Sequence, residues 1–459
     1  MPQGAAFFKK PLAFCVRLRY NGQDRAKEDD PVRMLLKGGL VYEHGSFSPM
    51  DIEVTDGVVT ARGASLFPSG NAEQVFPLNG LFVFPGFADV HVHLREPGFS
   101  YKETIASGSR ACARGGYTAV CAMPNLNPAP DSPAHLAEEE ALIRRDAVIR
   151  VLPYGCITKG QKGEGELVDF SAMANRVAGF SDDGRGVKEE SLMREAMLRC
   201  REAGSIIVAH CEDVSLIPKG GAIHDGAYAR ANGIPGIPSE SEWGPIARDL
   251  RLAKETGCPY HVCHVSCRES VELIRRAKAE GVDVTCETGP HYLLMCQDDL
   301  RDEGRFKMNP PLRDKADQEA LLEGVLDGTI DMIATDHAPH SAEEKSRGLR
   351  GSAMGVVGIE TAFPLLYTHL VKPGRLRLER LIDALTAAPR RRFRLGGGLQ
   401  VGDRAEVCAF DLHARGTVNP EDFLSMGRAT PFEGWPVEAA CRFTLCGETI
   451  AYNTLEGGC

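Results

Sequence analysis

The stretch Asp89-Val90-His91-Val92-His93-Leu94-Arg95-Glu96-Pro97-Gly98 is the part of the sequence that decides the fold assignment. It continues the apolar run 81–87, and together they predict a buried strand that ends near His93. Because side chains alternate along a strand, Asp89 and both histidines are expected on one face and both valines on the other. Two imidazoles on one face can bind one metal ion, although packing alone also explains such a pair.

Further apolar segments in the middle of the chain end in polar residues, and helical patterns separate several of them. The predicted strands end near His93, Asn125, Tyr154, Ser181, His210, Ser266, Glu287 and Asp336. Helical patterns cover, for example, residues 189–202, 241–254 and 269–279. Eight strands with helical crossovers predict an α/β fold, a (β/α)8 TIM-like barrel, in which the chemistry takes place at the C-terminal ends of the strands.

Both ends of the chain are predicted to be rich in β-strands. Apolar or alternating segments lie between turns that contain Gly and Asp. We therefore predict a small β-sandwich domain built from residues 34–87 and 395–459, which flanks a barrel formed by residues 88–394. Residues 1–33 lack clear periodicity and are expected to be an N-terminal extension, with Met34 as a candidate alternative start.

The composition excludes several classes of protein. Of the 459 residues, 43% are hydrophobic and 25% are charged, which is typical of a soluble globular protein and not of a disordered chain. No apolar run approaches the roughly 18 residues that a membrane-spanning helix needs. The net charge of −10 argues against general binding to nucleic acid or to acidic membranes. The 15 cysteines are scattered and no secretory signal is evident, so we expect reduced thiols in a cytoplasmic protein.

The pattern Asp-x-His-x-His-x-Arg-x-Pro-Gly at residues 89–98 resembles the signature of the dihydroorotases, within the metal-dependent amidohydrolase superfamily. The resemblance covers roughly residues 34–435 through further motifs in the same order. These are Met123-Pro124-Asn125, Phe180-Ser181-Asp182-Asp183-Gly184, Ala209-His210-Cys211-Glu212, His261-Val262-Cys263-His264-Val265-Ser266, Lys307-Met308-Asn309-Pro310-Pro311-Leu312-Arg313 and Ala334-Thr335-Asp336-His337-Ala338-Pro339-His340. The second of these motifs resembles the segment of bacterial class I dihydroorotases in which an aspartate bridges two zinc ions.

The resemblance implies two Zn²⁺ ions per chain, held by four histidines and two aspartates. One ion would be bound by His91, His93, Asp183 and Asp336, and the other by Asp183, His210 and His264. Many superfamily members bridge their metals with a carboxylated lysine instead, and Lys159 is the candidate for that role. Asp183 is favoured because it precedes His210 by 27 residues, which matches the class I pattern, whereas Asp182 is expected to cap the turn.

The Cys- and His-rich stretch Cys258–Cys267 has an alternative interpretation as a structural zinc knuckle. On a strand, His264 would share a face with Val262, while His261 and Cys263 would lie on the opposite face. These side chains could then not surround one ion, so the knuckle is disfavoured.

Asp336 is the implied catalytic residue, as the base that takes a proton from the attacking water and returns it to the leaving nitrogen. The implied substrate contacts are His93, Arg95, Asn125, Asn309 and His340, together with main-chain groups of Met354 and Gly355. Arg95 offers a planar fork for a carboxylate, although a solvated loop arginine is the alternative. Asn125 has the alternative role of a turn residue. The charged, glycine-containing segment 343–351 is a candidate for a flexible loop over the site.

The resemblance implies a zinc-dependent dihydroorotase, which reversibly interconverts N-carbamoyl-L-aspartate and (S)-dihydroorotate plus water in pyrimidine biosynthesis. One alternative is another cyclic-amide hydrolase, namely a dihydropyrimidinase, hydantoinase or allantoinase, whose neutral substrates would not need Arg95. A second alternative is a catalytically inactive dihydroorotase-like partner of aspartate transcarbamoylase, which a loss of metal ligands would mark. We expect a homodimer with no nucleic-acid or membrane partner, and association with aspartate transcarbamoylase stays open.

Overall fold

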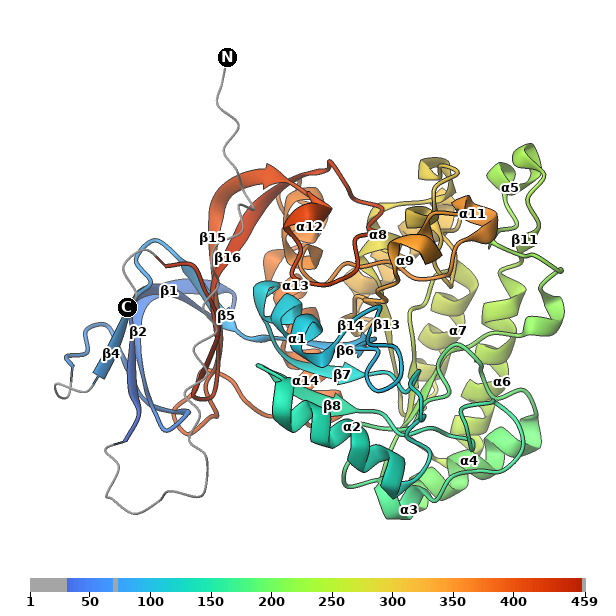
Figure 1. The fold of residues 1–459 in the computed structure, drawn as a ribbon, viewed down its shortest axis with the longest axis horizontal. Helices are drawn as coiled ribbons and strands as arrows, with labels where there is room; N and C mark the ends of the chain where they lie inside the picture. Colours follow the sequence, from blue (N-terminus) through green and yellow to red (C-terminus); the bar gives the residue numbers. More distant parts are fainter. Residues whose placement is uncertain (1–30, 69–72, 456–459) are drawn as a thin grey trace.

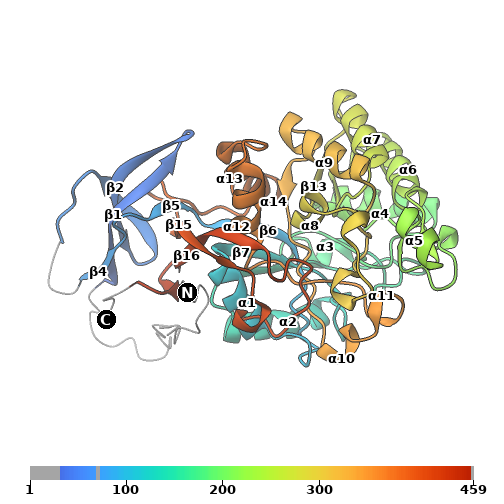
Figure 2. The ribbon, with the colours of Figure 1, turned by 90° about the horizontal axis from the view of Figure 1, so that it is seen from above.

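The computed structural model describes residues 31–68 and 73–455, which form a β-sheet region and a larger α/β region (Figure 1). The two regions lie next to each other in both views of the ribbon (Figure 2). The predictions for residues 1–30 lie outside the described residues. Met34 is the second residue of the first strand.

Strands from both ends of the chain form one mixed sheet, in the order β17-β16-β15-β5-β1-β2-β3, with β4 paired to β1. The strands are β1 (Arg33–Glu43), β2 (Ser46–Thr55), β3 (Val58–Gly63), β4 (Glu73–Pro77), β5 (Phe82–Pro85), β15 (Glu406–Thr417), β16 (Pro436–Cys446) and β17 (Thr449–Asn453). The register of β1 shifts between Leu36 and Gly39, so its first half pairs with β4 and its second half pairs with β5. This shift lets the sheet curve around its own core.

The core of this region joins the two ends of the chain. Met34 and Val54, from the N-terminal strands, belong to one buried cluster with Val407 and Phe443, from the C-terminal strands. The prediction that both chain ends build one β domain is confirmed. The strands form a single continuous sheet, and the domain boundaries at residues 88 and 395 stay predictions.

The α/β region is a closed ring of parallel strands. Its strands are β6 (Phe87–Val92), β7 (Tyr117–Ala122), β8 (Arg150–Pro153), β9 (Ile207–Ala209), β12 (Tyr260–Val262), β13 (Val284–Thr288) and β14 (Met332–Ile333). Phe180 supplies the fourth position, because it bridges Gly155, beyond β8, and Ile207 of β9. His337, beyond β14, bridges Val92 of β6 and closes the ring. The predicted barrel is confirmed, with one of its eight strands reduced to a bridge.

Helices surround this ring (Figures 1 and 2). The longer ones are α1 (Ile105–Arg114), α2 (Pro133–Asp146), α4 (Glu190–Glu202), α6 (Glu240–Thr256), α7 (Arg268–Ala279), α9 (Lys315–Asp327), α13 (Leu378–Leu385) and α14 (Ala387–Phe393). Shorter ones are α3 (Phe170–Met173), α5 (Ala227–Asn232), α8 (Pro290–Leu294), α10 (Ala342–Lys345), α11 (Gly348–Gly351) and α12 (Ala362–Leu366). The helices predicted over 189–202, 241–254 and 269–279 correspond to α4, α6 and α7.

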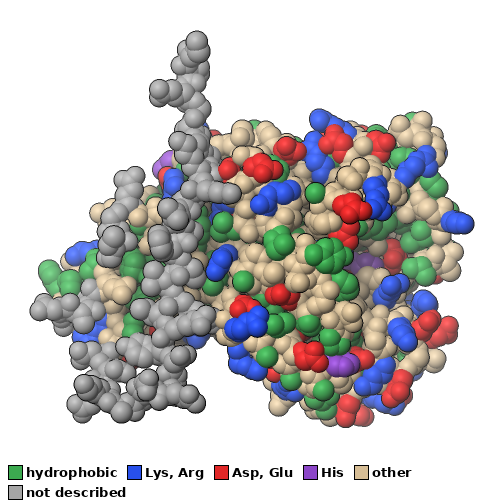
Figure 3. All heavy atoms as spheres, in the orientation of Figure 1, with side chains coloured by type: hydrophobic (Ala, Val, Ile, Leu, Met, Phe, Trp, Pro, Cys, Tyr) green, Lys and Arg blue, Asp and Glu red, His purple; other side chains and the backbone are tan. Residues whose placement is uncertain are grey.

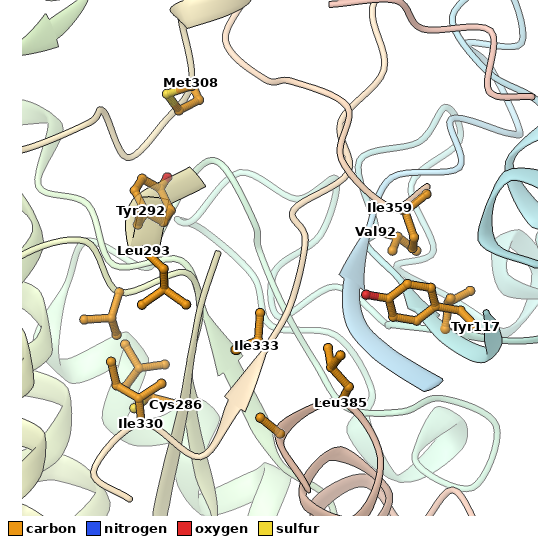
Figure 4. Packing of buried hydrophobic residues seen from close by; sticks show 14 of the residues in the cluster. Val92, Tyr117, Cys286, Tyr292, Leu293, Met308, Ile330, Ile333, Ile359 and Leu385 are labelled. Atoms are coloured by element: carbon orange, nitrogen blue, oxygen red, sulfur yellow. The ribbon is translucent and has the colours of Figure 1, made fainter. Parts of the chain in front are cut away.

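Apolar contacts hold the parts of the molecule together. Phe410 of β15 packs against Phe87 and Phe363, with ring centroids 5.5 and 4.6 Å apart, and so joins the sheet to the barrel. The larger buried cluster continues between strands and helices. Figure 4 shows part of it, including Ile333 of β14 and Leu385 of α13.

The face of the molecule in Figure 3 carries acidic and basic side chains interspersed over the barrel. Among the helices that the structure describes, we find none with the length and apolar character needed to cross a membrane.

Helix α2 buries one carboxyl group that lacks a full set of partners. Glu139 is 2% exposed, and its Oε2 atom has no hydrogen-bond partner among the described residues. Burial, with a smaller contribution from the charge of Glu140, raises the pKa of Glu139 well above its usual value. The folded state therefore binds this proton more tightly than the unfolded chain. Stability is lost as the pH rises from the unfolded pKa, about 4.3, through the folded pKa.

We expect Glu139→Gln to stabilise the protein at about pH 7.5 and to have little effect near pH 4, where the wild-type carboxyl is already neutral. The gain in unfolding free energy should be about 1–3 kcal/mol, because the folded wild type must hold a proton that the unfolded chain releases at this pH, a cost that the neutral glutamine avoids. Thermal unfolding at both pH values measures it. The exposed neighbour Glu138 gives the control Glu138→Gln, which changes a solvated side chain and should alter the unfolding free energy little. An equal effect of Glu139→Gln at both pH values would contradict the assignment.

Candidate metal centre

Strand β6 carries the first two histidines, but its side chains do not simply alternate. The register of β6 against β7 shifts between Asp89 and Val92, where β6 has an extra residue. As a result, Val90 and Val92 pack in different buried clusters. The prediction that both valines share one face was therefore wrong. His91 and His93 nevertheless converge on one site, as the following distances show.

The carboxylate of Asp183 lies among four imidazoles. Its Oδ1 atom is 3.5 Å from His91 Nε2, 3.5 Å from His210 Nδ1 and 3.6 Å from His264 Nε2. Its Oδ2 atom is 3.7 Å from His93 Nε2. Asp183 belongs to two groups of possible ligand atoms, each within 4.8 Å, which are His91, His93 and Asp183 and Asp183, His210 and His264. Asp183 belongs to both groups, as a bridging ligand would.

Asp336 lies beside the first group, with its Oδ1 atom 3.1 Å from His93 Nε2 and 3.5 Å from His91 Nε2. Asp336 and His264 both have left-handed backbone conformations, with φ of 46° and 32°. Such conformations cost non-glycine residues about 1–3 kcal/mol and are concentrated at functional sites. The backbone here is therefore held in a shape that brings these two side chains to the cluster.

The two alternatives to Asp183 lie elsewhere. Asp182 accepts hydrogen bonds from three main-chain N–H groups in the segment 157–163, at 2.8 to 3.2 Å. Asp182 therefore caps the segment 157–163 and not its own turn, which was the expected role. Lys159 donates from Nζ to the carbonyl of Asp131 at 3.0 Å. Asp182 belongs to neither ligand group, and the Nζ atom of Lys159 is held at the Asp131 carbonyl.

The Cys- and His-rich stretch Cys258–Cys267 does not surround one ion in the described structure. His264 lies with Asp183, whereas His261 contacts Glu287 at 3.0 Å. Strand β12 ends at Val262, so the alternation used to place His264 does not extend that far. The conclusion against a zinc knuckle stands. The two histidines point to different partners because the chain leaves the strand after Val262, and not because side chains alternate along a strand.

The site is suited to positive charge. Burial by itself raises the pKa of Asp183, but the surrounding histidines outweigh it and hold this pKa well below its usual value. Burial by itself also raises the pKa of Asp336, but His93, His91 and His264 outweigh it and hold this pKa below its usual value. Burial by itself lowers the pKa of His210, yet Asp183 and Glu212 raise it to about 10. Both aspartates are therefore ionised at neutral pH and would stabilise a bound cation.

Two atoms at the centre support a metal ion. His91 Nε2 and Asp183 Oδ1 are buried and have no hydrogen-bond partner among the described residues. Buried polar atoms are rarely left unpaired, and an ion bound by both atoms would explain them. Imidazole nitrogens and carboxylate oxygens are ligands that Zn²⁺ and similar divalent ions accept. The residues present therefore fit a site for divalent metal ions.

Glu287 lies behind the ligands and was not identified as a site residue from the sequence. Its Oε1 atom is 2.7 Å from His91 Nδ1, and its Oε2 atom is 3.0 Å from His261 Nε2. Burial by itself raises the pKa of Glu287, but His91 and His261 lower it to about 2, so this carboxylate is ionised. The contact directs His91 Nε2 toward the ligand group. The sequence separation of 196 residues explains why no local pattern revealed it.

A cavity of about 240 Å³ opens over the ligand groups. It is lined by His93, Arg95, Asn125, Asp183, Gly184, His210, His264, Asn309, Asp336, Ala338, His340, Met354 and Gly355. Every residue predicted as a substrate contact is among them. Arg95 is 9% exposed, and its Nε atom donates to the carbonyl of Pro339 at 3.2 Å. Arg95 is therefore not a solvated loop charge.

The two asparagines in the cavity have their amide nitrogens engaged by the protein. Asn125 donates from Nδ2 to the carbonyl of Asp183 at 2.9 Å, and its Oδ1 atom is buried without a partner among the described residues. Asn309 donates from Nδ2 to Glu212 Oε1 at 2.8 Å. Glu212 also lies 3.6 Å from His210 Nε2 and was not predicted to act in the site. The Oδ1 atoms of both asparagines are left to accept hydrogen bonds from a ligand.

The main-chain groups of Met354 and Gly355 are used within the protein. The Met354 carbonyl lies 2.8 Å from His340 Nε2, within hydrogen-bond distance. Gly355 donates its N–H to the Lys307 carbonyl at 3.1 Å, and its own carbonyl accepts from Lys345 at 2.7 Å. A Cβ atom at Gly355, where φ is 125°, would lie 2.8 Å from another Cβ atom, so only glycine fits. Both residues line the cavity, but these polar groups are already paired.

The chain is similar to known proteins over nearly its whole length. Residues 80–270 match the family described as Dihydro-orotase-like. The chain is 50% identical over 422 residues to a dihydroorotase of Shouchella clausii, with 91% of this chain and 97% of that protein covered. It is 48% identical over 424 residues to a dihydroorotase of Geobacillus thermodenitrificans, with 92% and 99% covered.

Solved structures share the fold. The L-hydantoinase (dihydropyrimidinase) of Arthrobacter aurescens superposes with a TM-score of 0.81 at 28% identity, covering 92% of this chain and 96% of that chain. A D-hydantoinase superposes with a TM-score of 0.78 at 22% identity, covering 92% and 95%, which confirms the predicted fold class. Sequence identity to the dihydroorotases is much higher. The chain belongs to the dihydroorotase family.

Proposed function

We propose that this protein is a zinc-dependent dihydroorotase, a cyclic-amide hydrolase that reversibly interconverts N-carbamoyl-L-aspartate and (S)-dihydroorotate plus water. The observation that carries the proposal is the buried Arg95 in the same cavity as the two ligand groups that share Asp183. A guanidinium beside a hydrolytic metal site suits a cyclic amide that carries a carboxylate. The nearly full-length identity to dihydroorotases supports the same conclusion.

We infer that two Zn²⁺ ions are bound. One would be held by His91, His93, Asp183 and Asp336, and the other by Asp183, His210 and His264. When bound, such ions lower the pKa of a water molecule to about 7 and polarise an amide carbonyl. Glu287 orients the His91 imidazole from behind, which fixes the nitrogen that His91 presents, and the Glu212 carboxylate lies 3.6 Å from His210 Nε2.

Asp336 is the group placed to move the proton. It lines the cavity, and its low pKa keeps it ionised at neutral pH. In hydrolysis it accepts a proton from the attacking water and delivers it to the ring nitrogen, because an amide nitrogen leaves poorly unless it is protonated. In ring closure the same carboxyl group acts in the opposite sense, as an acid.

The other cavity residues orient the substrate. Arg95 supplies the positive charge for the substrate carboxylate, and its Nη2 atom lies 3.4 Å from His340 Nε2, which places both on one wall. Asn125 and Asn309 offer Oδ1 atoms that can accept hydrogen bonds from ring N–H groups. These contacts fit an anionic ring with N–H donors. His93 lies where the substrate cavity meets the metal ligands.

Hydantoinase or dihydropyrimidinase activity is the second candidate function, because the A. aurescens L-hydantoinase shares the fold over 92% of this chain. Metal content per chain and turnover of dihydroorotate, dihydrouracil, hydantoin and allantoin, measured on one preparation, separate the two. We expect metal-dependent turnover with dihydroorotate strongly preferred. Preference for a neutral ring would favour the second candidate, and metal-loaded protein inactive on every substrate would contradict both.

Arg95→Met should raise KM for dihydroorotate about 10- to 100-fold, because a hydrogen-bonded contact to a charged group is lost. Any turnover of dihydrouracil, which lacks the carboxylate, should be unaffected. Steady-state kinetics with both substrates checks this. Arg185→Met, which changes an exposed arginine outside the cavity lining, is the control. Unchanged KM in Arg95→Met would remove Arg95 from substrate binding.

We also propose that the protein is a cytoplasmic homodimer without nucleic-acid or membrane partners. The net charge of −10 and the scattered cysteines, nearly all of which are buried among the described residues, support the location and the absence of such partners. Aspartate transcarbamoylase is a candidate partner. Light scattering of the protein alone and mixed with that enzyme tests both statements: a mass of two chains alone is expected, and a monomer would contradict it.

A further inference from the structure

Lys345, at the end of α10, is a buried lysine at the back of the catalytic cavity wall. It is 9% exposed, and its Nζ atom donates to the carbonyls of Ala353 and Gly355 at 2.7 Å each and to that of Lys307 at 3.0 Å. These three hydrogen bonds use all the protons of the ammonium group. The lysine therefore connects two segments that are separate in sequence, one ending at Gly355 and one beginning at Lys307.

Both segments carry cavity residues. Met354 and Gly355 line the cavity directly, and Lys307 lies two residues before Asn309, which also lines it. The N–H of Gly355 donates to the same Lys307 carbonyl that accepts from Lys345. Lys345 thus completes a small network that fixes the position of one wall relative to the other. The network also turns the carbonyl and N–H of Gly355 away from any ligand.

Burying an ammonium group costs free energy unless hydrogen bonds or an opposite charge compensate it. In the described part of the chain, no carboxylate lies within 4.0 Å of Lys345 Nζ, so the three carbonyls are its only close partners. Burial, together with the charge of Lys307, lowers the pKa of Lys345 to about 7. An apolar side chain would avoid this cost but would leave three carbonyls without their donor.

The segment around Lys345 is also held from outside. The predicted flexible loop 343–351 contains the helix α11, which lies next to α5 in both ribbon views (Figures 1 and 2). Arg350 of α11 donates to the carbonyl of Gly233 at 2.6 Å, and the N–H of Leu349 donates to Asp302 at 2.8 Å. Lys345 therefore lies between the segment that Leu349 and Arg350 hold in place and the cavity wall.

We propose that Lys345 is a positioning residue for the substrate, which holds the wall at Met354 and Gly355 in register with the wall at Asn309. The inference rests on the proposed dihydroorotase function, because that function defines the substrate that the wall would position. Because Lys345 touches neither Asp336 nor the metal ligands, it should affect substrate binding and not the chemical step.

Lys345→Met should raise KM for dihydroorotate about 10-fold or more while kcat changes less than about 3-fold and the metal content stays the same. Lys307→Met is the matched control. It removes a neighbouring ammonium group that is outside the network, because Lys307 Nζ donates only to the Arg350 carbonyl, at 3.0 Å, and it keeps the Lys307 main-chain carbonyl. We expect a small change in KM for this control. Unchanged KM in Lys345→Met, or equal changes in both variants, would overturn the proposal.

Two further measurements separate positioning from a general loss of structure. Lys345→Ala leaves space for a small alkylammonium ion, and added propylammonium should lower the raised KM toward the wild-type value. No rescue would overturn the proposal. Hydrogen exchange at the Gly355 amide should be at least about 10-fold faster in Lys345→Met than in the wild type, because its network is broken. This measurement needs no turnover, so it tests the network even if the wild type does not act on dihydroorotate; unchanged exchange would also overturn the proposal.

Discussion

Asp336→Asn should lower the rates of dihydroorotate hydrolysis and of ring closure by about 10³-fold, because an amide cannot accept and return a proton as a carboxylate does. The substitution keeps the shape of the side chain. The contact of its Oδ1 atom with His93 Nε2, which is 3.1 Å in the wild type, can therefore be retained. Both rates are measured on one preparation, with metal content determined in parallel, so that loss of metal and loss of proton transfer are distinguished.

The pH dependence of the wild type gives a second check on Asp336. Hydrolysis requires the ionised carboxylate, whereas ring closure requires the protonated form. The hydrolysis rate should therefore rise with pH and level off on the alkaline side, while the rate of ring closure should fall through a similar apparent pKa. Measurements over about pH 5.5 to 9.5 bracket the pKa near 7 of water at a zinc site.

This apparent pKa belongs to the coupled site and not to Asp336 alone. Parallel pH profiles in the two directions would contradict the proposed role of Asp336. So would near-normal turnover by Asp336→Asn that has retained its metal.

Asp183→Ala should remove bound metal and abolish activity, because its carboxylate lies within 3.7 Å of four imidazole nitrogens that form both ligand groups. We expect fewer than about one ion per chain after gel filtration and a loss in rate of about 10³-fold or more. Elemental analysis of the purified variant, with thermal unfolding in the presence and absence of a chelator, measures the effect.

Lys159→Ala is the matched control for the bridging ligand. The Nζ atom of Lys159 donates to the Asp131 carbonyl at 3.0 Å, so this variant should keep its metal. Asp182→Asn is a second control, which should loosen the segment 157–163 without removing metal. If Lys159→Ala were the variant that lost metal, a lysine-bridged centre would replace the one proposed.

Much of the fold could be predicted because its signals are local. The helices α4, α6 and α7 begin and end within two residues of their predicted positions. The prediction near Ser181 was less accurate, because that segment contributes only the bridges of Phe180 to its two neighbours. Asp182, the next residue, instead caps the segment 157–163, a contact that no periodic pattern encodes.

In the candidate site, too, some residues could be predicted from the sequence and others could not. His91, His93, Asp183, His210, His264 and Asp336 were all predicted, and the structure brings them together. Glu287 and Glu212 could not be assigned roles, because each acts on a residue from another strand or loop. The polar groups of Gly355 were expected to face the substrate, but they are paired with Lys307 and Lys345.

The sequence by itself determined the alternation of strands and helices, the β domain built from both chain ends and the set of polar residues at strand ends. These features depend on periodicity and on residue type within short segments. Only the tertiary structure decided which nitrogens and oxygens face one another. An extra residue in β6 and left-handed turns at His264 and Asp336 redirect side chains that strand alternation would place elsewhere. Closure of the ring then brings His91 to Glu287, 196 residues away, and such a contact is set by packing and not by any local pattern.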